Sequence, residues 1–274
     1  MSQIDSSQSL STTLALAARR EILDMTHRAN ASHVGSALSV IDILAVLYSG
    51  GANIASSNVD NPERDIVILS KGHSASALYA VLGLKGFFPR EWLLNYSGNG
   101  ALLGGHVTSK GVPGVELSTG SLGHGFPYGL GIALSRSRQS KNGHVFVIMS
   151  DGECNEGTTW ESAMIANHHK LSNLTVIIDR NRIQSLAPTE DTLALEPFAA
   201  KWRAFGWDVM EIPGHDHAQL LQSLRSSKSP RCVIADTVKG KGVNFMENSV
   251  LWHYKSPSLE ELQEAKSLLE ANYS

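Results

Sequence analysis

The sequence is poor in cysteine, in net charge and in long apolar runs, and each scarcity excludes a class of protein. Two cysteines, Cys154 and Cys232, are too few for a disulfide framework and lack metal-site spacing, so a reducing, cytoplasmic setting is expected. A formal net charge of −3 favours neither nucleic acid nor an anionic membrane as a partner. No apolar run approaches the roughly 20 residues that span a bilayer. Residues 1–11 are polar and carry no secretion core.

What the sequence does contain is enough material for one large α/β domain. It has 274 residues, of which 42% are apolar and 18% charged, as in a soluble globular protein. It shows no internal repeat, low-complexity linker or break in composition. We therefore expect a single domain over residues 1–274, with a frayed N-terminus at 1–11 and a helix at the C-terminus.

Four short runs of apolar, mostly β-branched residues predict the strands of a sheet. Because the runs are uniformly apolar rather than alternating, they are typical of parallel strands buried on both faces. The runs are 66–69, 145–149, 174–178 and 232–235.

Helical spacing and capping signals fill the intervals between these strands. Apolar residues recur at helical spacing over 14–29, and a second helix is expected to begin at Ser39 as its N-cap. Thr158 and Ser258, each followed three residues later by Glu, predict capping boxes, the first opening a helix that runs to His169. The pattern predicts a doubly wound, mostly parallel α/β sheet with helices on both faces.

Polar residues follow two strands that should be neighbours in this sheet. Asp151 comes directly after 145–149, and Asn181 follows 174–178. Ligands bind at the carboxyl ends of parallel strands, so these side chains should converge there. A carboxylate, an amide oxygen and a backbone carbonyl suit Mg²⁺, and Gly152 would let the backbone approach a phosphate. The alternative is an acidic turn that only caps a helix. The glycine-rich run 120–125 is equally open, as a flexible turn or a second backbone approach to a ligand.

Five segments, in order along the chain, match the motifs of one enzyme family. They are 32–35 (Ser-His-Val-Gly), 70–73 (Ser-Lys-Gly-His), 105–123 with its histidine and glycine run, 150–181 and 237–253. Together they resemble the transketolase family over residues 13–257, and specifically its N-terminal, diphosphate-binding part. Two segments depart from the family pattern, since Ser150 replaces the usual glycine and 32–35 replaces Gly-His-Pro-Gly.

The resemblance implies a thiamine-diphosphate-binding fold, with thiamine diphosphate and Mg²⁺ as cofactors. It assigns the metal to Asp151, Asn181 and the carbonyl of Ile183. It assigns proton transfer and hydroxyl binding to His33, His106 and His253, since the ordinary pKa of histidine suits that work. The residues that it places against the cofactor are His73, Gly120, Ser121, Leu122, Gly152, Glu153, Asn181 and His253.

Several of these residues also have a purely structural interpretation. A single histidine is more often structural, and only the motif context favours function for His33, His73 and His253. Charge complementarity with a helix N-terminus would account for Glu153. Cys154 could be reactive, although an inert buried thiol is favoured. His215 and His217 follow a turn, where the start of a helix is expected.

The resemblance further implies a partner chain. The pyrimidine-binding half of the family has no place in a sequence that stops near Ser274, so an α₂β₂ assembly with a C-terminal transketolase subunit is expected. The implied reaction transfers a two-carbon ketol unit from a ketose phosphate to an aldose phosphate. The alternatives are a subunit of another thiamine diphosphate enzyme, such as a deoxyxylulose-phosphate synthase or a transketolase for an unusual ketose, and a non-catalytic regulatory subunit. A nicotinamide-binding Rossmann enzyme is disfavoured because no strand leads into Gly-x-Gly-x-x-Gly.

Overall fold

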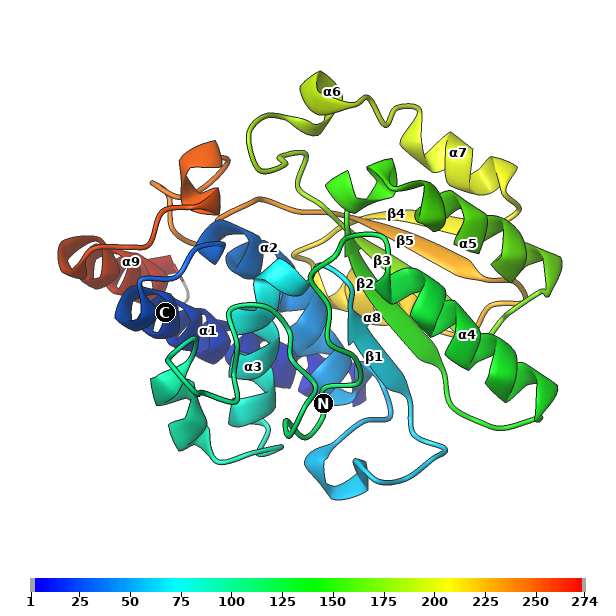
Figure 1. Ribbon diagram of the computed structural model, residues 1–274, viewed down its shortest axis with the longest axis horizontal. Coiled ribbons are helices and arrows are strands. Elements are labelled where there is room, and N and C mark those ends of the chain that lie inside the picture. Colours follow the sequence, from blue (N-terminus) through cyan, green and yellow to red (C-terminus); the bar gives the residue numbers. More distant parts are fainter. Residues whose placement is uncertain (1–2, 273–274) are drawn as a thin grey trace.

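The computed structural model describes residues 3–272 and contains a parallel five-stranded sheet of order β1-β2-β3-β5-β4 (Figure 1). All four predicted strands are confirmed, three of them longer by one or two residues. The strands are β1 (Ile66–Leu69), β2 (Val145–Ser150), β3 (Leu174–Arg180), β4 (Asp208–Pro213) and β5 (Arg231–Asp236). Strand β4 was not predicted, because it lies at the edge of the sheet and is only partly buried.

Helices cover both faces of the sheet, as predicted (Figure 1). Side chains alternate along each strand, so that Leu69 packs into one apolar core and Ile68 into the other. The first face carries α1 (Gln3–Ala29), α2 (Val34–Val46), α3 (Ala75–Leu84), α8 (His217–Ser223) and α9 (Leu259–Asn272). The second face carries α4 (Gly125–Arg138), α5 (Gly157–His168) and α7 (Phe198–Ala204).

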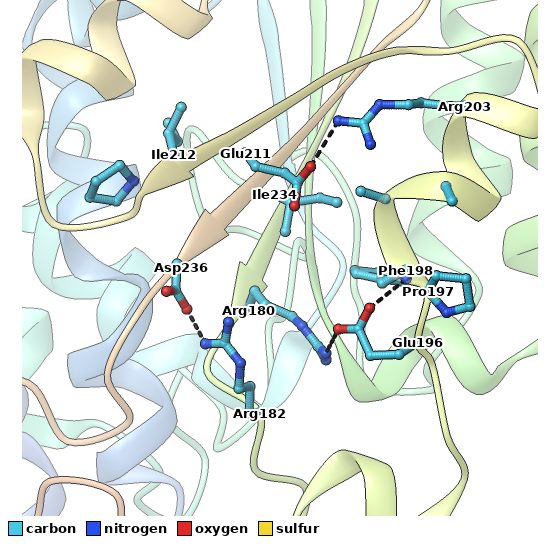
Figure 2. Close-up of a pocket in the computed structure, with 13 residues that line it drawn as sticks. Arg180, Arg182, Glu196, Pro197, Phe198, Arg203, Glu211, Ile212, Ile234 and Asp236 are labelled. Atoms are coloured by element: carbon cyan, nitrogen blue, oxygen red, sulfur yellow. Dashed lines mark hydrogen bonds and ion pairs between the residues drawn. The ribbon is translucent and has the colours of Figure 1, made fainter.

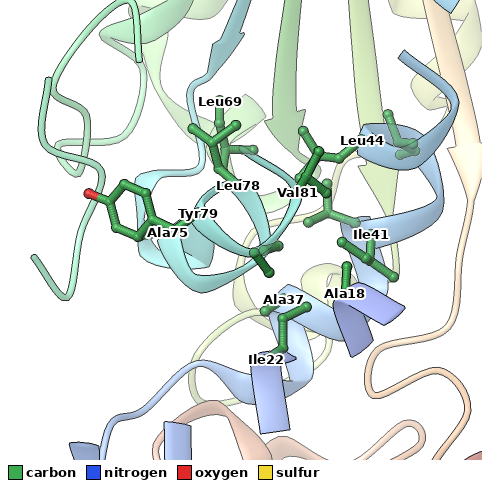
Figure 3. Close-up of a cluster of buried hydrophobic side chains, with 14 of the residues drawn as sticks. Ala18, Ile22, Ala37, Ile41, Leu44, Leu69, Ala75, Leu78, Tyr79 and Val81 are labelled. Atoms are coloured by element: carbon green, nitrogen blue, oxygen red, sulfur yellow. The ribbon is translucent and has the colours of Figure 1, made fainter. Parts of the chain in front are cut away.

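The first core is built mainly by α1, α2 and α3 (Figure 3). Ile22 of α1, Ile41 of α2 and Leu78 of α3 are all at most 2% exposed and pack together beneath Leu69. Helix α2 is buried along its whole length. This packing fixes the N-terminus of α2, where His33 lies, against the carboxyl edge of the sheet.

The strong apolarity of α2 has a second consequence. Among the described residues, Val34–Gly51 is long and apolar enough to cross a membrane by length and composition. However, 83% of this window is buried inside the fold, and a core helix of a globular protein passes the same test.

Two predictions about the first two helices were wrong. Helix α1 already begins at Gln3, so the described part of 1–11 is helical rather than frayed, with Ser11 donating to the carbonyl of Gln8; residues 1–2 lie outside the described part. Ser39 is not an N-cap, because α2 begins at Val34 and the Ser39 hydroxyl instead donates to Asp179 at 2.6 Å.

The predicted capping boxes had opposite outcomes. The Thr158 box is wrong, since α5 already begins at Gly157 and the Thr158 hydroxyl donates to the carbonyl of Gly123. The Ser258 box is confirmed, because Ser258 and Glu261 exchange reciprocal backbone-to-side-chain hydrogen bonds at the start of α9.

Both cysteines are buried free thiols on the sheet side of the second core. Burial raises the pKa of Cys154 and of Cys232 well above the ordinary value. A thiol with a raised pKa is a poor nucleophile, so the structure favours the inert interpretation of Cys154.

Candidate active site

A cavity of about 220 Å³ opens at the carboxyl edge of the sheet, between β1, β2 and β3. Most of the residues predicted from the sequence line it, and they come from segments far apart in the chain. The lining consists of His33, Ser36, Lys71, His73, His106, Gly120, Leu122, Ser150, Asp151, Gly152, Asn181, Ile183, Gln184, Ser185 and His253. Of the predicted residues, Ser121 is exposed and Glu153 fully buried, and neither is part of this lining.

The register of the sheet explains why Asp151 and Asn181 share this cavity. Ser150 pairs with Asp179 across β2 and β3, so Asp151 and Asn181 both follow the end of their strands at the same edge. The Asp151 carboxylate accepts hydrogen bonds from the backbone N–H groups of Gly152 (2.7 Å) and Arg182 (2.6 Å). The Asn181 amide donates to Ser39 and its oxygen accepts from the N–H of Ile183. Both side chains are therefore held in place by the protein.

The donor set of this corner fits a hard divalent cation. A carboxylate, an amide oxygen and the carbonyl of Ile183 line one cavity, and oxygen is the ligand atom that Mg²⁺ prefers. Asp151 is 1% exposed. Its burial raises the pKa of the carboxyl, although the N–H of Arg182 and the charge of Arg180 act in the opposite direction. A bound cation would stabilise the charged carboxylate there.

Ser150, the departure from the family motif, is accommodated by its neighbour Glu153. The Ser150 hydroxyl accepts from the N–H of Glu153 at 3.3 Å, and the Glu153 carboxylate accepts from the N–H of Ser150 at 3.4 Å. Glu153 also accepts from the Ser70 hydroxyl and from the N–H of Gly123 at 2.9 Å. It thus ties the end of β2 to the glycine-rich run from behind the cavity, a positioning contact that the sequence did not suggest.

Four histidines gather around the mouth of the cavity. The ring of His33 lies 5.3 Å from that of His73, 5.6 Å from His106 and 4.9 Å from His253, measured between centroids. Burial, and to a lesser extent nearby cationic groups, lowers the pKa of His33 to about 4 and that of His253 to about 3. Burial likewise lowers the pKa of His73. These three rings are therefore neutral near pH 7, each able to donate one hydrogen bond and accept another.

Local contacts fix the orientation of two of these rings. The Lys239 ammonium lies 3.0 Å from Nδ1 of His253, and because an ammonium can only donate, Nε2 of His253 carries the proton. The Ser32 hydroxyl oxygen lies 2.9 Å from Nδ1 of His33. His33 has a φ of +71°, an uncommon backbone conformation for a residue other than glycine, and its N–H donates to the carbonyl of His253 at 2.7 Å.

Two buried lysines complete the site, and neither was predicted as a site residue. Lys71 lines the cavity and pairs with Asp179, with both side chains fully buried. Lys239 donates to the carbonyls of Ile183 and Gln184 at 3.2 and 3.0 Å, and burial, followed by the charge of Lys71, lowers its pKa to about 8. Both lysines lie in segments that match the family motifs, 70–73 and 237–253. A search of those segments for cations that could balance a diphosphate would have found them.

The remaining histidines lie elsewhere. His217 is the first residue of α8, as expected, with Asp216 as the N-cap. His215 and His217 both bind the carboxylate of Asp42, at 2.6 and 3.0 Å. They belong to a separate buried cluster on the first face of the sheet.

Comparison with known proteins agrees with this geometry. Residues 10–272 match the family described as transketolase, thiamine diphosphate binding domain. The chain belongs to the transketolase family. The predicted resemblance to the N-terminal, diphosphate-binding part of transketolases is therefore confirmed, and a nicotinamide-binding Rossmann enzyme is excluded.

The transketolase relatives include short and long proteins. One of the subunits of the apulose-4-phosphate transketolase of Phocaeicola vulgatus is 39% identical over 251 residues, covering 90% of this chain and 89% of the relative. The 6-deoxy-6-sulfo-D-fructose transketolase subunit SqwG of a Clostridium species is 37% identical, covering 86% and 87%. The crystal structure of Campylobacter jejuni transketolase superposes with a TM-score of 0.90 at 28% identity, covering 96% of this chain but 43% of that one.

Proposed function

We propose that this chain is the thiamine-diphosphate-binding subunit of a two-subunit transketolase, which transfers a two-carbon ketol unit from a ketose phosphate to an aldose phosphate. One observation carries the proposal: Asp151, Asn181 and Ile183 share a cavity with four clustered histidines. The family match supplies the cofactor class. The names of two short relatives, each a transketolase subunit, support the division into two chains.

In the proposed mechanism, thiamine diphosphate supplies the carbanion chemistry that breaks and forms the carbon–carbon bond. Asp151, Asn181 and the carbonyl of Ile183 would hold Mg²⁺ beside the diphosphate. Lys71, which lines the cavity, and Lys239, which donates to the carbonyl of Ile183, would offset its negative charge.

The histidines bind and move protons on the sugar. His253 presents its Nε2–H, because Lys239 occupies the other nitrogen, and so it donates to a carbonyl or hydroxyl oxygen of the substrate. His33 and His106, whose rings lie 5.6 Å apart, accept and return protons of sugar hydroxyls. His33, whose lowered pKa keeps its ring neutral near pH 7, can accept a hydroxyl proton without first losing its own.

The partner in the proposal is a C-terminal transketolase subunit that holds the pyrimidine ring, in a cytoplasmic α₂β₂ assembly. The names of the two short relatives, each a transketolase subunit, support the need for a partner chain. The residues that read the sugar are expected partly on the partner, and the names of the two short relatives support a substituted ketose as the donor.

Ketol transfer by the purified chain, with and without a co-expressed partner subunit, tests the proposal. We expect turnover of a ketose phosphate that requires thiamine diphosphate, Mg²⁺ and both chains. Robust turnover by this chain alone would contradict the need for a partner. Turnover of pyruvate instead of a ketose would favour the synthase alternative, and cofactor binding without turnover of either would favour a regulatory subunit.

A further inference from the structure

The 220 Å³ cavity of the candidate active site is here called the cofactor cavity. A second cavity, of about 580 Å³, lies at the ends of β3, β5 and β4 (Figure 2). Three arginines line it, and each pairs with an acidic residue. Two of these pairs, Arg182–Asp236 and Arg203–Glu211, have side chains more than 50% exposed. The third arginine, Arg180, is 3% exposed.

Arg180 lines the second cavity and also contacts Asp151, a residue that lines the cofactor cavity. On the cofactor side, its Nη1 lies 3.5 Å from Oδ2 of Asp151, in an ion pair whose two side chains are 3% and 2% exposed. On the other side, its Nη2 donates to Glu196 at 2.7 Å, as Figure 2 shows, and lies 3.6 Å from Glu190. Only the planar, forked guanidinium of arginine can serve both sides in this way.

The outer contacts of Arg180 all come from one stretch of chain, residues 183–198, here called the flanking segment. Nη1 donates to the Thr189 hydroxyl at 3.3 Å, and the guanidinium stacks 5.0 Å from the ring centre of Phe198. The first residues of the same segment, Ile183 to Ser185, line the cofactor cavity. Anchoring the far part of the segment therefore also restrains the part that would touch metal and diphosphate.

Backbone hydrogen bonds already hold the Asp151 carboxylate in place, so Arg180 is not needed to orient it. What Arg180 supplies there is charge: a buried carboxylate without a cation is costly, and in the metal-free chain the guanidinium is that cation. Its distance of 3.5 Å, longer than a direct hydrogen bond, leaves the outer lone pairs of Asp151 available to a metal.

We propose that Arg180 is a positioning residue with two functions: it is the counter-ion of Asp151 before the metal binds, and it anchors the flanking segment through Glu196 and Thr189. This inference rests on the proposed magnesium site at Asp151. If it is right, the order of the cofactor cavity depends on the Arg180–Glu196 ion pair, which lies outside that cavity.

The anchoring function is tested by limited proteolysis of the metal-free 274-residue chain, with cleavage inside 183–198 mapped by mass spectrometry. Arg180→Met should speed that cleavage about tenfold, the change expected from losing a charged hydrogen bond. Glu196→Gln, which retains Arg180 beside Asp151, should also speed it. Arg203→Met removes an exposed pair of the same cavity and should cleave like the wild type. Cleavage of Arg180→Met and Glu196→Gln within about twofold of this control would overturn the anchoring function.

The counter-ion function is tested by thermal unfolding with and without added MgCl₂ and thiamine diphosphate. Arg180→Met should unfold at a lower temperature than the wild type when metal-free. Its unfolding temperature should rise more than that of the wild type when MgCl₂ and thiamine diphosphate are added, because Mg²⁺ then supplies the missing charge. Arg180→Lys retains a cation and should gain as the wild type does. If the unfolding temperature of Arg180→Met rises no more than that of Arg203→Met on this addition, the counter-ion function is overturned. If the wild type gains nothing either alone or with its co-expressed partner, the proposed function itself is contradicted, whereas the proteolysis would still decide the role of Arg180.

Discussion

The described residues include two groups of buried and half-buried histidines whose surroundings differ. Around the cofactor cavity, His33, His73 and His253 face one another and two lysines, and their pKa values are lowered, first by burial. On the first face of the sheet, His215 and His217 share the carboxylate of Asp42 with Arg19. The first group leaves hydrogen-bonding capacity free toward a cavity, whereas the second uses it on protein partners. The hydrogen-bond partners of a histidine, and not its occurrence in the sequence, therefore indicate whether it is functional or structural.

The two carboxylates of this comparison differ in the same way. Burial raises the pKa of Asp42, but Arg19 and the two histidines outweigh that effect and hold it well below the ordinary value. For Asp151 burial prevails and the pKa is raised. Asp42 is thus fully compensated within the chain, and Asp151 is a site that a further cation would complete.

The largest effect is expected from Asp151→Asn. Removing the only carboxylate of the proposed metal site should weaken Mg²⁺-dependent binding of thiamine diphosphate at least about a hundredfold. The metal-free chain should remain folded but unfold at a modestly lower temperature, because asparagine has one acceptor oxygen whereas the N–H groups of Gly152 and Arg182 donate to different carboxylate oxygens of Asp151. Calorimetry on the reconstituted two-chain complex measures the affinity, and an unchanged value would refute the metal assignment.

The opposite pattern is expected from Asp42→Asn. This change leaves Arg19 buried without its bidentate partner, so the free energy of unfolding should fall by about 3–5 kcal/mol. Cofactor affinity of the folded fraction should be unchanged, since Asp42 lies outside the cofactor cavity. Denaturant unfolding measures the loss. If the variant does not fold, His217→Asn should give a smaller loss in the same direction, and a fully stable Asp42→Asn would show that the cluster is dispensable.

The pH dependence of stability should come in part from His33 in the cavity and in part from His144 outside it, whose pKa burial also lowers to about 4. The pKa of His33 is about 4 in the folded chain and near 6.5 when unfolded, so the unfolded state binds protons first as the pH falls. Stability should therefore decrease between about pH 6.5 and 4 and be unaffected by His33 above that window. The substitution His33→Asn should reduce this pH dependence, and asparagine tolerates the positive φ of this position. Unfolding midpoints measured from about pH 7.5 to 4.5 would show it, and an identical slope in both proteins would contradict it.

The smallest effect is expected from Ser32→Ala. The hydroxyl of Ser32 contacts Nδ1 of His33 and stands where the family usually has glycine. Its loss should leave stability within about 0.5 kcal/mol and lower kcat by up to about tenfold, the value of one hydrogen bond. The limbs of the pH–rate profile should shift, because the ring of His33 is no longer held in one orientation. A changed KM with unchanged kcat would assign Ser32 to substrate binding instead.

The sequence predicted those parts of the molecule whose signal is local. Strands buried on both faces were found from their uniform apolarity, whereas β4 was missed because an edge strand containing Glu211 carries no such pattern. The edge position of Asp151 and Asn181 followed from parallel topology alone. Motif resemblance found the histidines.

Contacts between distant residues could not be predicted. Ser39 was misread as a helix cap because its partner, Asp179, is 140 residues away. The Lys71–Asp179 pair and the contact of Arg180 with Asp151 depend likewise on how strands are placed side by side. Local signals for capping are identical whether the hydroxyl ends up at a helix end or inside a core, so only the tertiary structure decides.

The two buried thiols make the chain convenient to follow in solution. Cys154 and Cys232 are 0% exposed, both pack into the second core, and they should react with a maleimide or disulfide reagent only when that core opens. The rate of their labelling would report global opening without any engineered probe. A single cysteine introduced at Leu186 of the flanking segment, which is 80% exposed, would label at once, and so could carry a fluorophore for observing ligand binding in the native background.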